Sequence, residues 1–253
     1  GLLVMVYVLM TTGARSVGAA LRGGPYAYVY LIAMSGTGIL FTLAVSHTSV
    51  ANVVFIIASM PVFAAILSFV WMGEAISRRM MVTMIAVFGG LGIITYSSGE
   101  THGASLKGDL LAVCVSFVFA VALTAARRVR SVSMVPMLPV AYLVSALCLS
   151  PFVLPLQLEA SQYSLVALHG LFIGISSVGL ALGPRYIPSA EVALLILLES
   201  VLAPLLVWFL LGEDPGAYAL VGGAVVISAL GLSNLVVLMR KRAKADPIGR
   251  AAP

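Results

Sequence analysis

Residues 62–74 read VFAAILSFVWMGE, and residues 201–213 read VLAPLLVWFLLGE. Each stretch closes a long apolar run on Gly-Glu, and the second begins 139 residues after the first. The surrounding segments, 51–92 and 190–231, align at the same offset without a gap. A repeat that keeps one register over this length indicates a duplicated structural unit. The sequence therefore predicts a chain built from two related copies.

The composition predicts that these copies lie in a membrane. The chain has 253 residues, of which 61% are hydrophobic and 9% are charged. A soluble domain carries about 25% charged residues, so lipid is the solvent that this composition fits. Both cysteines, Cys114 and Cys148, lie inside apolar runs and show no metal or redox spacing.

The apolar runs are long and continuous, and this favours helices over strands. In hydrocarbon only helices and closed barrels satisfy every backbone polar group, and barrel strands alternate over about ten residues. We expect an all-α polytopic helix bundle with nine visible spans. They are a partial run at 1–13, then 27–47, 49–73, 78–98, 108–128, 134–155, 163–183, 189–211 and 216–239. The first run is shorter than the roughly 20 residues that a spanning helix needs, so we expect it to be the end of a longer span.

The basic residues indicate the orientation of these spans. If the breaks between spans alternate sides, thirteen of the 14 lysines and arginines fall on one face, and Lys107 alone falls on the other. The thirteen are Arg15, Arg22, Arg78, Arg79, Arg127, Arg128, Arg130, Arg185, Arg240, Lys241, Arg242, Lys244 and Arg250. Cytoplasmic loops carry the excess of such residues, so we expect this face and the C-terminus to be cytoplasmic. The basic tail then meets lipid headgroups of the inner (plasma) membrane rather than nucleic acid.

The span count predicts that the two copies are inverted. Five spans separate equivalent points, and because five is odd, related segments cross the bilayer in opposite directions. Inverted repeats are the architecture of many carriers, with the substrate path between the repeats. We expect a first repeat at 1–98 that lacks its first helix, an external linker at 99–107, a second repeat at 108–239 and a basic tail at 240–253.

Three stretches resemble one known family. They are LAVSHTSVANVVFIIASMPVFAAILSFVWMGE (43–74), GDLLAVCVSFVFAVALTAARR (108–128) and AEVALLILLESVLAPLLVWFLLGE (190–213). In order and spacing they resemble the EamA-type carriers of the drug/metabolite transporter superfamily, which have ten helices in two five-helix repeats. The resemblance implies a solute carrier, often an exporter of amino acids or other small metabolites.

Glu199 is the first candidate for a functional residue. It lies about 16 Å into the span at 189–211, counting 1.5 Å per residue, and therefore near the middle of the bilayer. An ionised carboxylate there costs at least about 2.5–3.5 kcal/mol, so it should face a cavity or a partner, or be protonated. It would bind a substrate ammonium group or carry a coupling proton. The alternative is a structural carboxyl group that is hydrogen-bonded between helices.

Other polar residues inside the spans are weaker candidates of the same kind. His169 titrates in a range that suits proton relay, although a lone membrane histidine also serves as a packing residue. Asn52 would line the path or cap its helix. Four small polar residues would hydrogen-bond a solute, and the alternative is a hydrogen bond to their own helix backbone or to a neighbouring helix. They are Thr37, Ser59, Ser176 and Ser177.

Two other functional classes compete with a carrier. A membrane-embedded enzyme would carry a motif such as G-x-S-x-G, H-E-x-x-H or a phosphate-binding Gly-Lys loop, and the sequence contains none of them. A channel would carry a repeated filter-like segment or a ring of charges. We therefore expect no catalysis, cofactor or metal. The expected partners are an amino acid or similar metabolite, a coupling proton and membrane lipids, with the oligomeric state left open.

The expected mechanism is alternating access, in which two five-helix halves rock about a central cavity. Helices at 27–47, 49–73, 108–128, 163–183 and 189–211 would line the route. The glycine-rich spans at 78–98 and 216–239 would lie outside them as supports, because glycines permit close helix packing.

Overall fold

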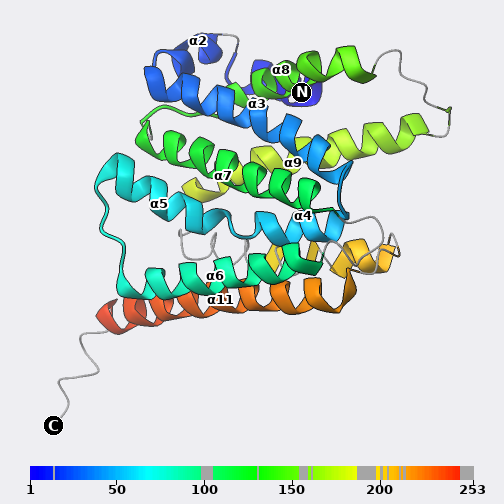
Figure 1. Ribbon diagram of the computed structural model, residues 1–253. Helices are drawn as coiled ribbons and strands as arrows, with labels where there is room; N and C mark the ends of the chain where they lie inside the picture. The colour runs from blue at the N-terminus through cyan, green and yellow to red at the C-terminus, as the bar shows by residue number, and fades with distance from the viewer. Residues whose placement is uncertain are drawn as a thin grey trace.

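The structure of the chain is a computed structural model. It describes residues 1–13, 15–97, 105–129, 131–153, 159–160, 162–186, 198–199, 202–203, 205–210, 212 and 215–245. The regular elements assigned in these ranges are all helices: α1 (Leu2–Thr11), α2 (Arg15–Leu21), α3 (Pro25–Val45), α4 (Val50–Ile57), α5 (Met60–Met72), α6 (Arg78–Ser97), α7 (Leu106–Arg128), α8 (Met137–Val153), α9 (Gln162–Tyr186) and α11 (Gly216–Ala245). The predicted all-α class is confirmed (Figure 1).

The lengths of these helices confirm a polytopic membrane bundle. Within the described ranges, six helices are long and apolar enough to cross a membrane, or seven if α1 and α2, which meet at 99°, form one broken span. The helix α8 is apolar but shorter, at 17 residues, than the span predicted at 134–155. The predicted span at 189–211 lies largely outside the described residues.

Successive helices run back and forth across the bundle, so the helix ends that carry Arg78, Arg79, Arg127 and Arg128 lie at one end (Figure 1). We call this the arginine end. It is where α5 ends and α6 begins, and where α7 ends and α8 begins. At the opposite end, which we call the histidine end, the Lys107 ammonium lies 3.2 Å from the His47 ring. The described helices thus alternate direction as the charge pattern predicts.

The predicted span at 49–73 is a helix with a break in its middle. The hydroxyl group of Ser49 caps its start by accepting the Asn52 N–H at 3.2 Å. The first helix, α4, ends at Ile57 and α5 begins at Met60, although the two together make one 23-residue span. Pro61 causes the break, because it has no N–H to donate to the Ile57 carbonyl and its ring crowds that group.

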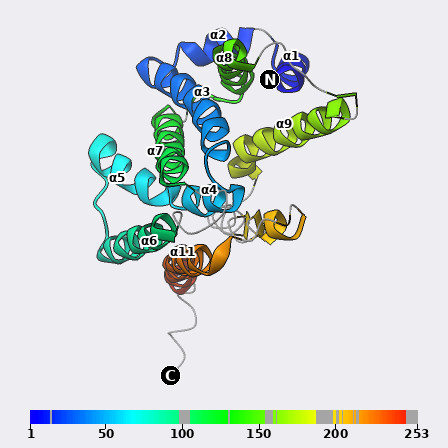
Figure 2. The same cartoon turned by 45° about the vertical axis from the view of Figure 1, so that its right-hand side comes forward.

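The helices α6 and α11 pack side by side in opposite directions (Figures 1 and 2). At the arginine end, Arg79 Nη1 donates to the Ser233 hydroxyl at 2.9 Å and also bonds its backbone carbonyl. At the other end, the rings of Tyr96 and Tyr218 meet edge to face with centroids 6.4 Å apart. These two helices correspond in the sequence repeat, so their antiparallel packing is what an inverted duplication requires.

Small residues bring the two helix backbones together at the centre of this pair. A Cβ atom placed on Gly90 would lie 2.8 Å from the Gly222 carbonyl oxygen, and one on Gly222 would lie 2.6 Å from the Gly90 carbonyl oxygen. Val87 and Val226, which occupy equivalent positions at the offset of 139, are both fully buried in one cluster. Equivalent residues of the two copies therefore lie where α6 and α11 cross.

The two sequence repeats interdigitate. The helix α7 opens the second repeat, but it packs against α3, α4 and α5 of the first. Figure 2 shows α7 between α3 and the broken α4–α5 span, while α6 and α11 form one edge of the bundle. The helix α3 also packs against α8. The described helices therefore do not separate into two independent halves.

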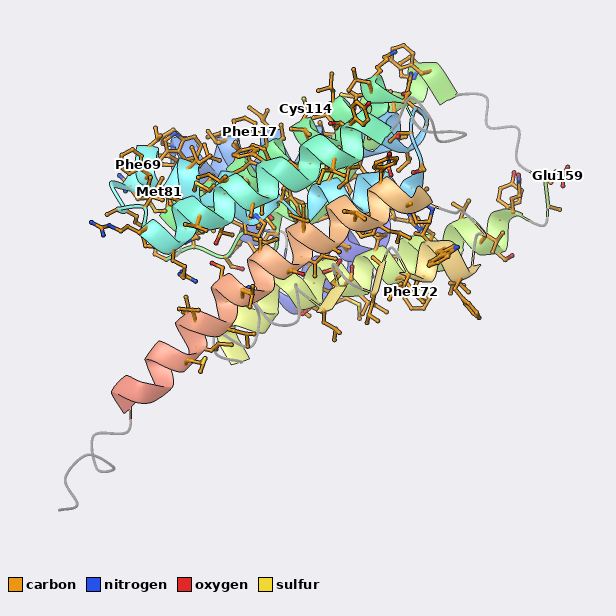
Figure 3. All side chains as sticks on the ribbon, turned by 60° about the horizontal axis from the view of Figure 1, so that its bottom comes forward. Phe69, Met81, Cys114, Phe117, Glu159 and Phe172 are labelled. Carbon is orange, nitrogen blue, oxygen red and sulfur yellow. The ribbon has the colours of Figure 1, made fainter. Side chains whose placement is uncertain are left out.

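The outer surface is apolar. Large side chains project outward from several helices, and Figure 3 labels four of them: Phe69 on α5, Met81 on α6, Phe117 on α7 and Phe172 on α9. Each is between 43% and 65% exposed. Soluble monomers rarely expose contiguous apolar surface on this scale, so these side chains face lipid.

Candidate functional site

A buried carboxylate lies at the start of α7, near the histidine end. Asp109 has no exposed surface. Its Oδ1 atom accepts the Thr48 hydroxyl at 2.7 Å and the Asn52 amide at 3.4 Å. The residue lies in the first helical turn, where the positive end of the helix dipole stabilises a negative charge. The arrangement thus binds the start of α4 to the start of α7.

A second polar contact joins the same helices two turns farther along. Ser59, in the break between α4 and α5, donates to the Ile56 carbonyl at 2.6 Å. Its oxygen also lies 3.0 Å from the Ser116 hydroxyl on α7. Both serines have no exposed surface. Because Ser59 uses its proton on Ile56, Ser116 is the donor between the two hydroxyl groups.

A third contact lies at the arginine end. One nitrogen of the Arg127 guanidinium donates to the buried Ser68 hydroxyl at 3.1 Å. Another donates to the Glu74 carboxylate, also at 3.1 Å, with both charged side chains about half exposed. Glu74 thus forms an ion pair that joins the end of α5 to the end of α7.

Two of the candidate residues, Asn52 and Ser59, lie in this interface. Their side chains are 1% and 0% exposed and bond α7 rather than open space. Ser49 supplies the helix cap that was one expectation for Asn52. The geometry gives both residues an interhelical bonding role. For Ser59 this is the alternative that the sequence left open, whereas for Asn52 it differs from both expected roles, which were lining the path and capping the helix.

Three further candidates bond locally. Thr37 is half-buried and donates to the Ala33 carbonyl of its own helix at 2.9 Å. Ser176 is exposed and donates to Ile173 at 3.3 Å. Ser177 donates to the Ile173 carbonyl of its own helix at 2.6 Å. Its oxygen also lies 2.6 Å from the hydroxyl group of Tyr142, which links α9 to α8.

The structure therefore does not gather the seven candidate residues into one site. His169 is exposed on α9. Glu199 is also exposed, and the adjoining residues 187–197 and 200–201 lie outside the described residues.

Sequence reasoning did not identify the partners of Asp109. An acidic residue inside an apolar run is a signal for a functional or paired group. The contact with Thr48 spans 61 residues of sequence, however, so nothing local to Asp109 points to it. Tyr142 was missed for the same reason, since its partner lies on another helix.

One groove lies on the edge of the bundle formed by α6 and α11. Its volume is about 470 Å³, and it is lined by Gly89, Gly92, Ile93, Tyr96, Tyr218 and Val221. None of these side chains is charged, and the groove is open on its outer side. An apolar groove of this kind has little to offer a charged solute, which is consistent with a supporting role for α6 and α11.

Comparison with known proteins places the chain in a family. The sequence profile of the EamA-like transporter family matches residues 1–96 and again residues 106–235, one match for each repeat. No curated protein and no solved structure matches the chain. The two matches cover most of the sequence, and their order agrees with the helical bundle described above. The chain therefore belongs to the EamA-like transporter family, within the drug/metabolite transporter superfamily, and is a multi-pass membrane transporter.

Proposed function

We propose that the protein exports amino acids or similar small metabolites across the inner membrane by alternating access. The arginine end of the bundle then faces the cytoplasm, as does the C-terminus. Support for this orientation comes from the helix ends: α6 begins with Arg78 and Arg79, α7 ends with Arg127 and Arg128, and the histidine end carries Lys107. Cytoplasmic ends of membrane helices carry this excess of basic residues.

Glu199 is the proposed substrate-binding or proton-coupling residue. The single observation that carries this choice is the contrast with Asp109, the other carboxylate described within a span. Asp109 is fully buried and already bonded by Thr48 and Asn52, whereas the Glu199 side chain is exposed. An exposed side chain in a span faces either lipid or a water-filled route, and an ionised carboxylate is costly in lipid. We therefore propose that Glu199 faces the route, where it meets a substrate ammonium group or a proton.

The other candidates have supporting places in the proposal. His169, Ser176 and Ser177 share α9, and two of these three side chains are exposed. Thr37 on α3 is half-buried. We propose that the route passes between α9 and α3, where these groups would hydrogen-bond the backbone of an amino acid. Asn52 and Ser59 would act indirectly, by fixing α4 and α5 against α7.

Counterflow in proteoliposomes tests the proposal. Purified protein would be reconstituted, loaded with unlabelled amino acids and exposed to each radiolabelled amino acid in turn. Glu199→Gln is expected to lower the initial rate at least tenfold. Glu159→Gln is the matched control, because it makes the same chemical change in an exposed residue outside the helices and should leave the rate unchanged.

Two outcomes would contradict the proposal. If no amino acid, nucleoside or sugar metabolite exchanges in the wild-type vesicles, the carrier function is wrong. If exchange depends on a proton gradient and that dependence survives Glu199→Gln, then Glu199 is not the coupling residue.

A further inference from the structure

The polar contacts between α4–α5 and α7 keep one register along the whole span. Thr48 bonds a residue 61 positions later, Asn52 and Ser59 bond residues 57 positions later, and Ser68 bonds one 59 positions later. A nearly constant separation means that the two helices run parallel and in step. The contacts are spread from the histidine end to the arginine end, so they join the helices over their full length.

Most of this interface is inaccessible to water. Asp109, Ser59 and Ser116 have no exposed surface, and Asn52 and Ser68 have 1% and 3%. Without water to replace a lost partner, sliding one helix past the other would leave several buried polar groups unpaired at once.

The backbones are also in close contact at the histidine end. A Cβ atom on Gly108 would lie 2.5 Å from the Thr48 Cβ and 2.6 Å from the His47 carbonyl carbon. Even the smallest side chain would therefore push this end of α7 away from the connection between α3 and α4. Together with the hydrogen bonds, this contact fixes both the spacing and the register of the pair.

The helix α9 is attached differently. Most of its described side chains are exposed, and Gly174 is buried against Val4 of α1. A side-chain hydrogen bond between Ser177 and Tyr142 joins the described part of α9 to α8. Figure 2 shows α9 on the far side of α3 and α7 from α5.

We propose that α4, α5 and α7 move as one rigid body during transport, and that α9 moves relative to it. The boundary between moving bodies then does not follow the boundary between sequence repeats, since α7 travels with helices of the first repeat. This inference rests on the proposed transport function. Asp109 acts in it as a positioning residue that holds α7 to α4.

Distances between spin labels test the inference in nanodiscs. The exposed cysteines would first be removed by Cys114→Ser and Cys148→Ser. Labels at Phe69→Cys and Leu110→Cys then report on α5 and α7 within the body. Labels at Phe69→Cys and Phe172→Cys report on α5 and α9 across the boundary. All three sites are exposed, at 52%, 55% and 65%, so the labels disturb little packing.

The measurements would be made with and without a mixture of the standard amino acids. The pair on α5 and α7 is expected to give one unchanged distance, and the pair on α5 and α9 to shift its population between two distances. The inference would be overturned if the pair on α5 and α7 showed two distances. It would also be overturned if the pair on α5 and α9 kept a single fixed distance while the protein exchanges amino acids in vesicles. Absence of exchange together with fixed distances for both pairs would instead reject the proposed function, so the two failures are distinguishable.

Variants of Asp109 add a readout that separates positioning from general stability. Asp109→Ala is expected to at least double the width of the distance distribution between Phe69→Cys and Leu110→Cys. Asp109→Asn should restore a narrow distribution, because its amide oxygen still accepts the Thr48 hydroxyl. If Asp109→Ala does not fold, Thr48→Val removes the same hydrogen bond and leaves the carboxylate in place. An unchanged width in the folded variants would refute the positioning role.

Discussion

The crossing of α6 and α11 allows a paired test of the packing. Gly89 and Gly90 are neighbours in the same helix, but they face different surroundings. A Cβ atom on Gly90 would lie 2.8 Å from the Gly222 carbonyl oxygen and 2.8 Å from Val226 Cγ2. A Cβ atom on Gly89 would meet nothing within 4 Å. Gly90→Ala and Gly89→Ala therefore make the same chemical change in a closed and an open environment.

The sizes of the two effects follow from these distances. Ordinary van der Waals contact begins at about 3.4 Å, so the new methyl group at Gly90 is 0.6 Å too close to a backbone atom that has no rotamer to change. Overpacking of this kind costs about 1–3 kcal/mol. Replacing glycine in a helix gains about 0.5–1 kcal/mol in both variants. Gly90→Ala should therefore be about 1–3 kcal/mol less stable than Gly89→Ala.

The assay is the fraction of protein that remains monodisperse after heating in detergent, measured by size-exclusion chromatography over a temperature series. Gly90→Ala is expected to lose its native peak at a lower temperature than wild type, and Gly89→Ala at the same or a higher temperature. If Gly90→Ala were as stable as Gly89→Ala, the close contact between the two backbones would be refuted. The antiparallel pairing that depends on it would then need another basis.

Two further predictions concern the polar contacts of α7. Asp109→Ala should lower the free energy of unfolding by about 1–3 kcal/mol, because Thr48 and Asn52 lose a buried acceptor. Asp109→Asn should lower it by less. The same heating series compares both variants with wild type. Glu74→Gln should change the free energy of unfolding by less than about 1 kcal/mol, because the ion pair of Glu74 with Arg127 is about half exposed. A larger loss of stability in the heating series would contradict this prediction.

Much of the fold could be predicted from the sequence because membrane spans leave long signals. The start of α6 follows from Ser77, whose hydroxyl group accepts the Met80 N–H in the structure. The cap of α7, where the Ser105 hydroxyl accepts the Gly108 N–H, came from the structure. The alternation of helix direction follows from the position of the arginines. Each of these signals is local, or depends only on counting spans.

The parts of the fold that could not be predicted from the sequence depend on contacts between spans. Apolar helices that are hydrophobic on all sides do not show which neighbour they will face, so the insertion of α7 among α3, α4 and α5 could not be predicted. The break between α4 and α5 had a local signal in Pro61, but membrane helices often tolerate proline without breaking. For the candidate site, residue type identified the polar groups in the spans, whereas their burial and partners came only from the structure.

Val87 and its counterpart Val226 share one buried cluster, and this has an evolutionary consequence. Before the duplication, these two positions were one position in a single half-length chain. Two such chains, inserted in opposite orientations, would have met at that valine across a two-fold axis in the membrane plane. With both copies in one chain, each side of the contact is free to change separately: Gly90 faces Gly222, while the counterpart of Gly90 in the second copy is Ala229.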